Sequence, residues 1–402
     1  MPISYTKPKG HDRNGNPRFE PDPKKYLYNV DTFWFNVGAD NYQDVLNNGL
    51  RDLLIEGRNY IMDTDEPMYI EVHLDYYENP LVFEILPGQP PLYQYSIRNS
   101  DLAIYFSKNA RIDQLPMKVQ LNQFILWEKG VLAAYKEALD ILNSLGFILN
   151  QKKLNRVDFA VHSDQYQWIL DDLKSFDYPR NIAQDNFPNF WRLDPLTGNF
   201  ETVYFGSRST CQLRIYNKSI EAKKKKKEYF LDLYESLGMD KDKVWNIEIE
   251  VRRDFIKECK SLDGLRLFDD LDVVFEEGRL SLLWSHLMKM YAHNSAHWTR
   301  VSKGKKNVFE KSKGYLKREK DNVANAYRET AQIRGRLMNF VLNDKNYSLE
   351  NAILKFIEMN KEYEEYTTKE WTDQVEKKKL KFHNVDINST VKNSNKNEKD
   401  AF

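Results

Sequence analysis

The sequence is poor in cysteine, glycine and proline, and neither charge is in excess. Cys211 and Cys259 are the only cysteines among 402 residues, so a disulfide framework and a four-cysteine zinc site are both excluded. The chain has 16 Gly and 14 Pro, too few for a fibrous or low-complexity protein. Its 60 basic and 60 acidic residues give a net charge of zero, which excludes a uniformly basic nucleic-acid coat protein but not a locally basic one.

Long apolar runs are also missing from the sequence. No run of about 18 apolar residues occurs, so we expect no transmembrane helix and no membrane partner. Residues 1–23 are polar, so we expect no signal peptide. Together with the low cysteine content, these absences predict a cytoplasmic protein.

The length and the composition predict two or three domains. Apolar residues make up 41% of the chain, enough for a sizeable core. We expect four regions: a flexible arm over 1–26, a domain containing a sheet over 27–260, a basic and helical region over 261–380, and a disordered tail over 381–402. The Asn- and Lys-rich composition of the last segment is typical of disorder.

The pattern of short segments predicts an α+β fold. Residues 68–122 contain short aromatic and β-branched runs between Pro, Gly, Asn and Asp, which is typical of an antiparallel meander. A helix is expected over 128–145, followed by strands at 154–162, 211–217 and 244–253. We therefore predict an antiparallel sheet with helices on one face and a mostly helical C-terminal region.

Three of the expected strands carry charged side chains on one face. Side chains alternate across a strand, so the polar faces are predicted to hold Arg156 and Asp158; Arg214, Tyr216 and Lys218; and Glu248, Glu250 and Arg252. A sheet with one buried and one solvated face produces such alternation without any function. The composition argues further, because three carboxylates, a tyrosine and four cations are an unusual choice for a plain solvated face.

If the three strands are neighbours, their carboxylates cluster and repel one another unless they are protonated or neutralised. A hard divalent cation neutralises carboxylates well, and Mg²⁺ is commonly held by one or two of them together with substrate phosphates. A tyrosine hydroxyl beside such a metal, surrounded by Arg and Lys, is suited to attack on a phosphodiester.

Four segments carry a resemblance to a known family: RVDFA at 156–160, YFGSR at 204–208, RIYNK at 214–218 and IEIEVRRD at 247–254. In this order, within roughly residues 30–290, the chain resembles the replication initiation factor family. Members of that family are rolling-circle plasmid replication initiators and relaxases of conjugative elements. The resemblance implies a DNA nickase and strand transferase that works through a 5′-phosphotyrosine, within a nicking domain at 27–260.

The resemblance also implies roles for individual residues. Tyr216 corresponds to the nucleophile, with Arg214 and Lys218 beside it. Asp158, Glu248 and Glu250 correspond to ligands of Mg²⁺ or Mn²⁺, and which glutamate contacts the metal stays open. The chain departs from some relatives at His162, where they carry an acid, and at Asn246, where they carry an arginine.

Basic residues in two parts of the chain are candidates for DNA contacts. Near the nucleophile they are Arg156, Arg208, Arg252, Lys223, Lys224 and Lys225; further along they are Lys305, Lys306 and Arg318. The second group lies in 301–345, where 12 Lys and Arg against 5 Asp and Glu give a local charge of +7. A solvated face is the alternative for both groups. The implied partners are plasmid or mobile-element origin DNA with an extruded single-stranded hairpin, a second copy of the chain in a homodimer, and a host helicase.

Three readings compete with a plasmid replication initiator. A conjugative relaxase shares the same chemistry, and the sequence does not separate the two. A non-catalytic DNA-binding regulator could keep the fold without the reaction. A glycosidase with a carboxylate pair would explain the acidic residues but would leave Tyr216 and the surrounding cations without a role.

Overall fold

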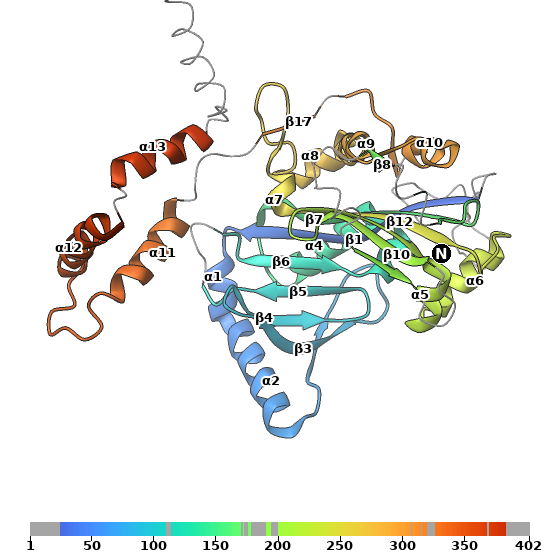
Figure 1. Cartoon of the computed structure of the whole chain (residues 1–402). Coiled ribbons are helices and arrows are strands. Elements are labelled where there is room, and N and C mark those ends of the chain that lie inside the picture. Colours follow the sequence, from blue (N-terminus) through green and yellow to red (C-terminus); the bar gives the residue numbers. More distant parts are fainter. Residues whose placement is uncertain are drawn as a thin grey trace, which may run out of the picture. The chain divides into compact units, whose positions relative to one another are not determined.

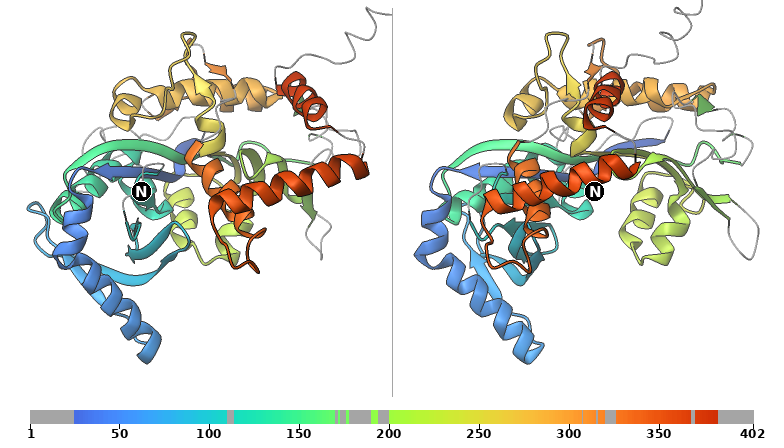
Figure 2. Two further views of the ribbon diagram at one scale, coloured as in Figure 1. Left: turned by 90° about the vertical axis from the view of Figure 1, so that its left-hand side faces the viewer. Right: turned by 60° about the vertical axis from the view of Figure 1, so that its left-hand side comes forward.

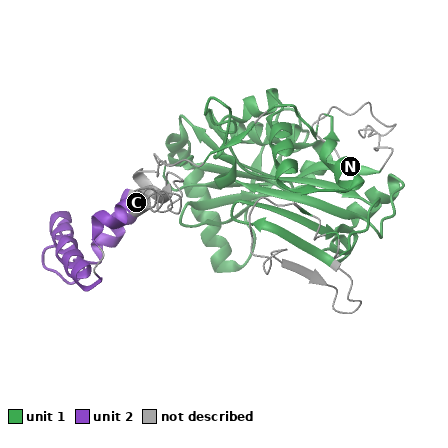
Figure 3. Cartoon of the chain, turned by 45° about the horizontal axis from the view of Figure 1, so that its top comes forward, with its two compact units in different colours: residues 1–319 green, residues 320–402 purple. Residues whose placement is uncertain are grey.

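The structure is a computed structural model, which describes residues 25–109, 114–169, 172, 176–177, 190–193, 200–306, 308–314, 316–319, 326–367 and 370–382. The chain divides into two compact units, Met1–Glu319 and Lys320–Phe402 (Figure 3). The first unit contains the sheet and the residues that the sequence singles out around Tyr216. The second contains three described helices, α11 (Ala326–Met338), α12 (Leu349–Thr367) and α13 (Trp371–Phe382).

An antiparallel sheet of eleven strands organises the first unit (Figure 1). The strands follow the order β2-β3-β4-β5-β6-β1-β7-β12-β11-β10-β9. Their bounds are β1 Tyr26–Ala39, β2 Tyr69–Val72, β3 Leu81–Gln89, β4 Tyr93–Arg98, β5 Leu102–Phe106, β6 Met117–Leu121, β7 Leu149–Ser163, β9 Phe190–Leu193, β10 Phe200–Ser207, β11 Cys211–Asn217 and β12 Trp245–Arg252. The predicted meander forms β2 to β6, and the three strands with polar faces are the adjacent β7, β12 and β11.

One face of the sheet carries the main hydrophobic core. In β1, Phe33 and Phe35 alternate with more exposed residues and point to this face. The helices α4 (Val131–Ser144), α8 (Leu271–Glu276), α9 (Arg279–Met290) and α10 (Ala296–Lys303) supply its other side. Phe35 packs on Tyr135 of α4 with ring centroids 5.1 Å apart. Aromatic side chains of these helices pack against those of the strands, and this packing buries the face.

Within the described ranges, a smaller cluster covers one end of the opposite face. There α3 (Gln123–Lys129), α5 (Lys218–Lys224) and α6 (Glu228–Ser236) bury Trp127, Ala160 and Phe230. Figure 2 shows α5 and α6 on the other side of the sheet from α8 to α10. The remainder of this face, which we call the open face, holds polar side chains of β1, β6, β7, β11 and β12.

Short elements complete the described chain. They are α1 (Tyr42–Val45), a π-helical turn at Leu46–Leu50, α2 (Arg51–Thr64) and α7 (Arg253–Ile256), together with the strand pairs β8 (Phe176–Asp177) with β14 (Ala292–His293), β13 (Cys259–Lys260) with β17 (Lys317–Arg318), and β15 (Gly304–Lys305) with β16 (Phe309–Glu310). None of the helices described is both long and apolar enough to cross a membrane.

The predicted α+β class is confirmed, with a large antiparallel sheet and a helical C-terminal part. The expectation of helices on one face only is wrong, because apolar residues of α3, α5 and α6 pack around Ala160 on the opposite face. The expected boundary at 260 does not coincide with the division between the units, which falls after Glu319. The physical reason is that helices beyond residue 260 pack on the sheet, as Trp284 does against Phe159 at 5.6 Å. Strand β1 already begins at Tyr26, and residues 1–24 of the expected arm and 383–402 of the expected tail lie outside the described residues.

Candidate active site

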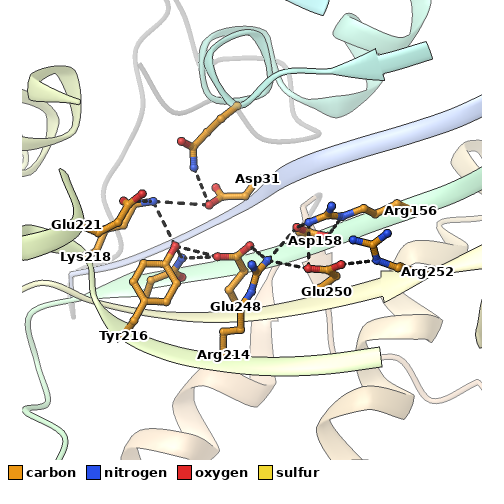
Figure 4. A network of polar contacts seen from close by, with 12 residues as sticks. Asp31, Arg156, Asp158, Arg214, Tyr216, Lys218, Glu221, Glu248, Glu250 and Arg252 are labelled. Atoms are coloured by element: carbon orange, nitrogen blue, oxygen red, sulfur yellow. Dashed lines mark hydrogen bonds and ion pairs between the residues drawn. The ribbon is translucent and has the colours of Figure 1, made fainter. Parts of the chain in front are cut away.

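The register of β7, β12 and β11 brings the predicted site residues together. Glu250 of β12 lies opposite Asp158 of β7, and Glu248 lies opposite Arg214 of β11. Because side chains at paired positions share a face, the three acids and Arg214 meet on the open face. Figure 4 shows them as one row of side chains that begins at Tyr216.

The hydroxyl of Tyr216 is held by three polar groups. It donates to Glu248 Oε2 at 2.8 Å, and it accepts from Asn246 Nδ2 at 2.9 Å and from Lys218 Nζ at 3.3 Å. Tyr216 is partly exposed and lines a pocket on the open face. A phenol that donates to a carboxylate and accepts from a lysine is positioned to lose its proton to the carboxylate.

The local charges set the protonation states of this pair. Burial raises the pKa of Tyr216 well above its usual value, and the charge of Glu248 raises it further. Burial would also raise the pKa of Glu248, but Arg214 and Lys218 outweigh burial and lower it below the usual value. The resting site therefore holds a neutral phenol that faces an ionised carboxylate.

Arg214 joins the three carboxylates into one network. Its Nη2 donates to Glu248, lies 3.1 Å from Asp158 Oδ2 and lies 3.2 Å from Glu250 Oε2. Arg156 donates two hydrogen bonds to Asp158, of 2.8 and 2.5 Å.

The network is closed at its far end by Arg252, which donates to Glu250 at 2.5 Å. Burial raises the pKa of Asp158 above its usual value, although Arg156 lowers it. Three arginines thus balance three carboxylates, two of which, Asp158 and Glu250, are fully buried.

This pairing bears on the expected metal. Carboxylate oxygens are the donor type that Mg²⁺ and Mn²⁺ prefer, but Asp158 and Glu250 use theirs to accept from arginines. Within the described residues, no group of three or more His, Cys, Asp or Glu is arranged to hold a metal ion. The side chains as arranged do not fit a resident divalent cation, so the reaction proposed for this site has no step through one. Dependence on Mg²⁺ or Mn²⁺ stays a prediction.

Asp31 is a site residue that the sequence did not reveal. The pairing of β1 with β7 shifts register between Val30 and Thr32, so a bulge at Asp31 turns its side chain from the core into the pocket. The carboxylate accepts from Trp127 Nε1 and, at 2.7 Å, from Gln123 Nε2. Burial raises the pKa of Asp31 to about 6, against the opposing charge of Lys218.

Lys218 reaches the site by a different route from the one predicted. Strand alternation placed it on β11, but β11 ends at Asn217, whose side chain caps α5 by accepting from Ile220 N at 3.0 Å. Lys218 is therefore the first residue of α5 and turns inward, where it is 1% exposed. Its ammonium pairs with Glu221 at 3.1 Å and lies 4.6 Å from the ring centre of Phe230.

The pocket around Tyr216 has a volume of about 520 Å³, and lysines form part of its rim. Lys224, Lys225 and Lys227 line it. Lys224 pairs with Glu201 at 2.7 Å and Lys225 with Glu221 at 2.9 Å. The lysine run thus lies at the mouth of the pocket, although Lys223 is turned to Asp242 at 2.6 Å.

The other predicted DNA-contact residues lie away from this pocket. Arg208 is exposed in the turn between β10 and β11, at the opposite end of that hairpin from Tyr216. Arg318 pairs with Glu258 at 2.6 Å and covers the ring of Phe255. Lys305 and Lys306 follow α10, on the helical side of the sheet. Their roles stay predictions, and the basic stretch 301–345 is divided between the two units.

Comparisons with known proteins add little. No family model matches the chain, and no curated protein matches it. Among solved structures, the chain is similar to a rolling circle replication initiator protein from Geobacillus stearothermophilus, with 15% identity over 72% of this chain and 100% of that one, at a TM-score of 0.36. A score this low carries no argument about fold or function, so any proposed activity depends on the geometry of the site.

Proposed function

We propose that the protein nicks single-stranded DNA and transfers the strand through a covalent phosphotyrosine at Tyr216. The observation that carries this proposal is the hydrogen bond of 2.8 Å between the Tyr216 hydroxyl and the ionised Glu248, in a pocket lined by arginine and lysine. A nucleophile, a base beside it and cations around it are the groups that transfer to a phosphodiester requires.

In the proposed step the Tyr216 oxygen attacks the phosphorus while its proton passes to Glu248. The bond from phosphorus to the 3′ oxygen of the preceding nucleotide breaks, and that oxygen takes a proton from water. The hydroxide left behind takes the proton from Glu248, which returns to its ionised form. The products are a 5′-phosphotyrosine and a free 3′-OH, and the phosphate remains a diester. A 3′-OH can therefore attack the phosphotyrosine in the reverse sense and reseal a strand.

Arg214 and Lys218 fit supporting roles in this step. Lys218 contacts the attacking oxygen, so its charge stabilises the phenolate as the proton leaves. Arg214 holds Glu248 toward Tyr216 and adds positive charge beside the phosphate oxygens. The lysines at the mouth of the pocket favour a polyanion, and such contacts weaken as salt rises.

The biological setting that we propose is initiation of rolling-circle plasmid replication, with conjugative transfer as the alternative that shares the chemistry. Origin DNA as the substrate follows from this setting. Homodimer formation, recruitment of a host helicase and metal dependence stay predictions.

A covalent-capture experiment tests the reaction without knowledge of the origin. The full chain is incubated with a random-sequence single-stranded DNA pool labelled at the 3′ end, in parallel with Mg²⁺, Mn²⁺ and EDTA. We expect a labelled protein band that survives SDS, and sequencing of its DNA identifies the cleavage site. The EDTA arm decides whether a metal is needed.

Two variants make the experiment specific. Tyr216→Phe should abolish the labelled band, whereas Tyr69→Phe, which alters an exposed tyrosine of the edge strand β2, should retain it. A labelled band from Tyr216→Phe, or none from the wild type in any arm, would refute the nickase.

One observation favours a second candidate, a DNA-binding regulator without catalysis. The Tyr216 hydroxyl is saturated by three partners, and its pKa is raised, so a purely structural phenol would look the same. DNA binding that is unchanged by Tyr216→Phe, together with no covalent band from the wild type, would identify the regulator.

A further inference from the structure

A buried lysine on the open face has no carboxylate partner within the part of the chain that the structure describes. Lys118 of β6 is 8% exposed. Within the described residues its ammonium contacts Gln89 Oε1 and the rings of three aromatic residues: Tyr105 at 4.3 Å, Tyr93 at 5.1 Å and Trp34 at 5.7 Å from the ring centres. Burial lowers the pKa of Lys118 to about 8. The rings and the amide oxygen offset part of the cost of burying this cation, but a buried charge is stabilised further by an opposite charge. The site therefore favours an anion.

Trp34 connects this lysine to the active-site pocket. It lines the pocket together with Gln120, the next residue after Lys118 on the same face of β6. The Trp34 ring lies 4.6 Å from the guanidinium of Arg156 and 5.8 Å from that of Arg252. Figure 4 shows that these two arginines form the end of the polar row that begins at Tyr216.

The strand order makes the arrangement continuous. Strands β11, β12, β7, β1, β6 and β5 are successive neighbours in the sheet, and Tyr105 of β5 lies opposite Lys118 of β6. Trp34 and Tyr105 are both partly exposed. A row of cations and aromatic rings therefore runs from the nucleophile across the open face.

We infer that Trp34, Lys118 and Tyr105 form a track for single-stranded DNA that leads to or from the scissile phosphate. The two rings stack on unpaired bases, and Lys118 binds a backbone phosphate between them. Cations beside aromatic rings are the usual elements of single-strand binding. The inference rests on the proposed action on single-stranded DNA. It adds a surface that positions the DNA several β-strands across the sheet from Tyr216.

The test measures binding and not cleavage, so its outcome is separate from that of the nicking assay. All variants carry Tyr216→Phe, and the probe is a fluorescein-labelled mixed-sequence single strand of about 16 nucleotides, the upper site size of single-strand modules. Anisotropy titrations over a range of salt give the affinity and its salt slope. A duplex of the same length is the comparison probe.

We expect Trp34→Ala and Trp34→Leu to weaken single-strand binding by roughly fivefold to a hundredfold, the range that one lost base stack produces. The leucine variant keeps most of the apolar volume, so an equal loss of affinity in both variants would show that the aromatic ring itself binds the DNA. Tyr69→Ala, on an exposed edge tyrosine, should leave the affinity unchanged.

Lys118→Met keeps the length of the side chain within its aromatic surroundings and removes the charge. We expect weaker single-strand binding and a salt slope reduced by about 0.7, the value for one phosphate of a single strand, with no loss of thermal stability. The control is Lys136→Met, which alters an exposed lysine of α4 and should change neither quantity.

Three results would overturn the track. The first is unchanged single-strand affinity in both Trp34 variants. The second is an equal loss of duplex binding, which would mean that the surface does not select unpaired bases. The third is a Lys118→Met variant that loses thermal stability but keeps the wild-type affinity and salt slope, which would assign the lysine a structural role.

Discussion

Two regions of the open face bury charge in opposite ways. Around Tyr216, each of the three carboxylates of β7 and β12 is paired with an arginine, and Arg214 contacts all three. On β6, Lys118 has three rings and an amide around it and, within the described chain, no opposite charge. The first region is electrostatically complete by itself, and the second is not.

The difference teaches what each region requires. Removal of one partner from a buried ion pair strongly destabilises the fold, because the other charge is left without a partner. The network around Tyr216 has its partners within the chain, so its geometry is set without a substrate. An unpaired buried cation weakens the fold until an anion binds. The network is suited to chemistry in a preset arrangement, and Lys118 is suited to binding a phosphate.

The largest effect is expected from removal of a carboxylate from the paired region. Asp158→Ala removes both hydrogen bonds that Arg156 makes to this carboxylate and one of the three carboxylate contacts of Arg214. Two carboxylates then face three arginines, so the free energy of unfolding should fall by about 3–5 kcal/mol. Urea denaturation followed by circular dichroism measures it. Asp52→Ala, at an exposed position of α2, should stay within about 0.5 kcal/mol of the wild type. A wild-type midpoint for Asp158→Ala would mean that the network adds no stability.

The unpaired region should respond in the opposite direction. Lys118→Met removes a charge that burial penalises, so we expect the free energy of unfolding at pH 7 to rise by about 1 kcal/mol. The same denaturation experiment measures it. A clear fall would show that the ammonium stabilises the fold and would remove the contrast between the regions.

The pH dependence of the wild type sharpens this expectation. The pKa of Lys118 is lowered to about 8 in the fold from its usual 10.5, so between these values the unfolded chain binds more protons. The penalty is fully present below pH 8, and stability should rise relative to Lys118→Met as the pH increases from 8 toward 10. The phenols that face Lys118, Tyr93 and Tyr105, have pKa values raised above 10 by burial and remain neutral in this window. Parallel curves for both proteins would contradict the assignment.

An effect no larger than that of Lys118→Met is expected at Tyr216, the proposed nucleophile. Tyr216→Phe removes one hydroxyl and its bonds to Glu248 and Asn246, which should cost about 1 kcal/mol of stability. Thermal unfolding by calorimetry measures it. A loss as large as that of Asp158→Ala would mean that the missing covalent band in this variant reports unfolding and not chemistry.

Strand alternation is a sound guide to part of the site. The alternation in RVDFA, RIYNK and IEIEVRRD places Arg156, Asp158, Arg214, Tyr216 and Glu248 on polar faces, and all of them line the pocket. Alternation is a local property of an extended chain, so the sequence carries it without knowledge of the fold. Trp34 of β1 and Lys118 of β6 also alternate with apolar residues. Trp34 lies in a run that is typical of a buried strand, and Lys118 lies in the predicted meander, so neither pattern singled the residue out as functional.

Other features had no local signal. The bulge that turns Asp31 into the pocket arises from the pairing of β1 with β7, and the burial of Lys218 follows from the cap at Asn217 and the packing of α5. The expectation of a metal among Asp158, Glu248 and Glu250 followed from their predicted clustering and from the family resemblance. Which cation faces them depends on the register of three strands.

The sequence by itself determined the α+β class, the strands and the side of each strand on which the charged residues lie, because these depend on periodicity along the chain. Only the tertiary structure decided that Arg214 lies opposite Glu248, that arginines pair with the buried carboxylates, and that Lys118 lacks such a partner among the described residues. Register and long-range packing set those pairings, since residues far apart in sequence become neighbours only when the sheet forms.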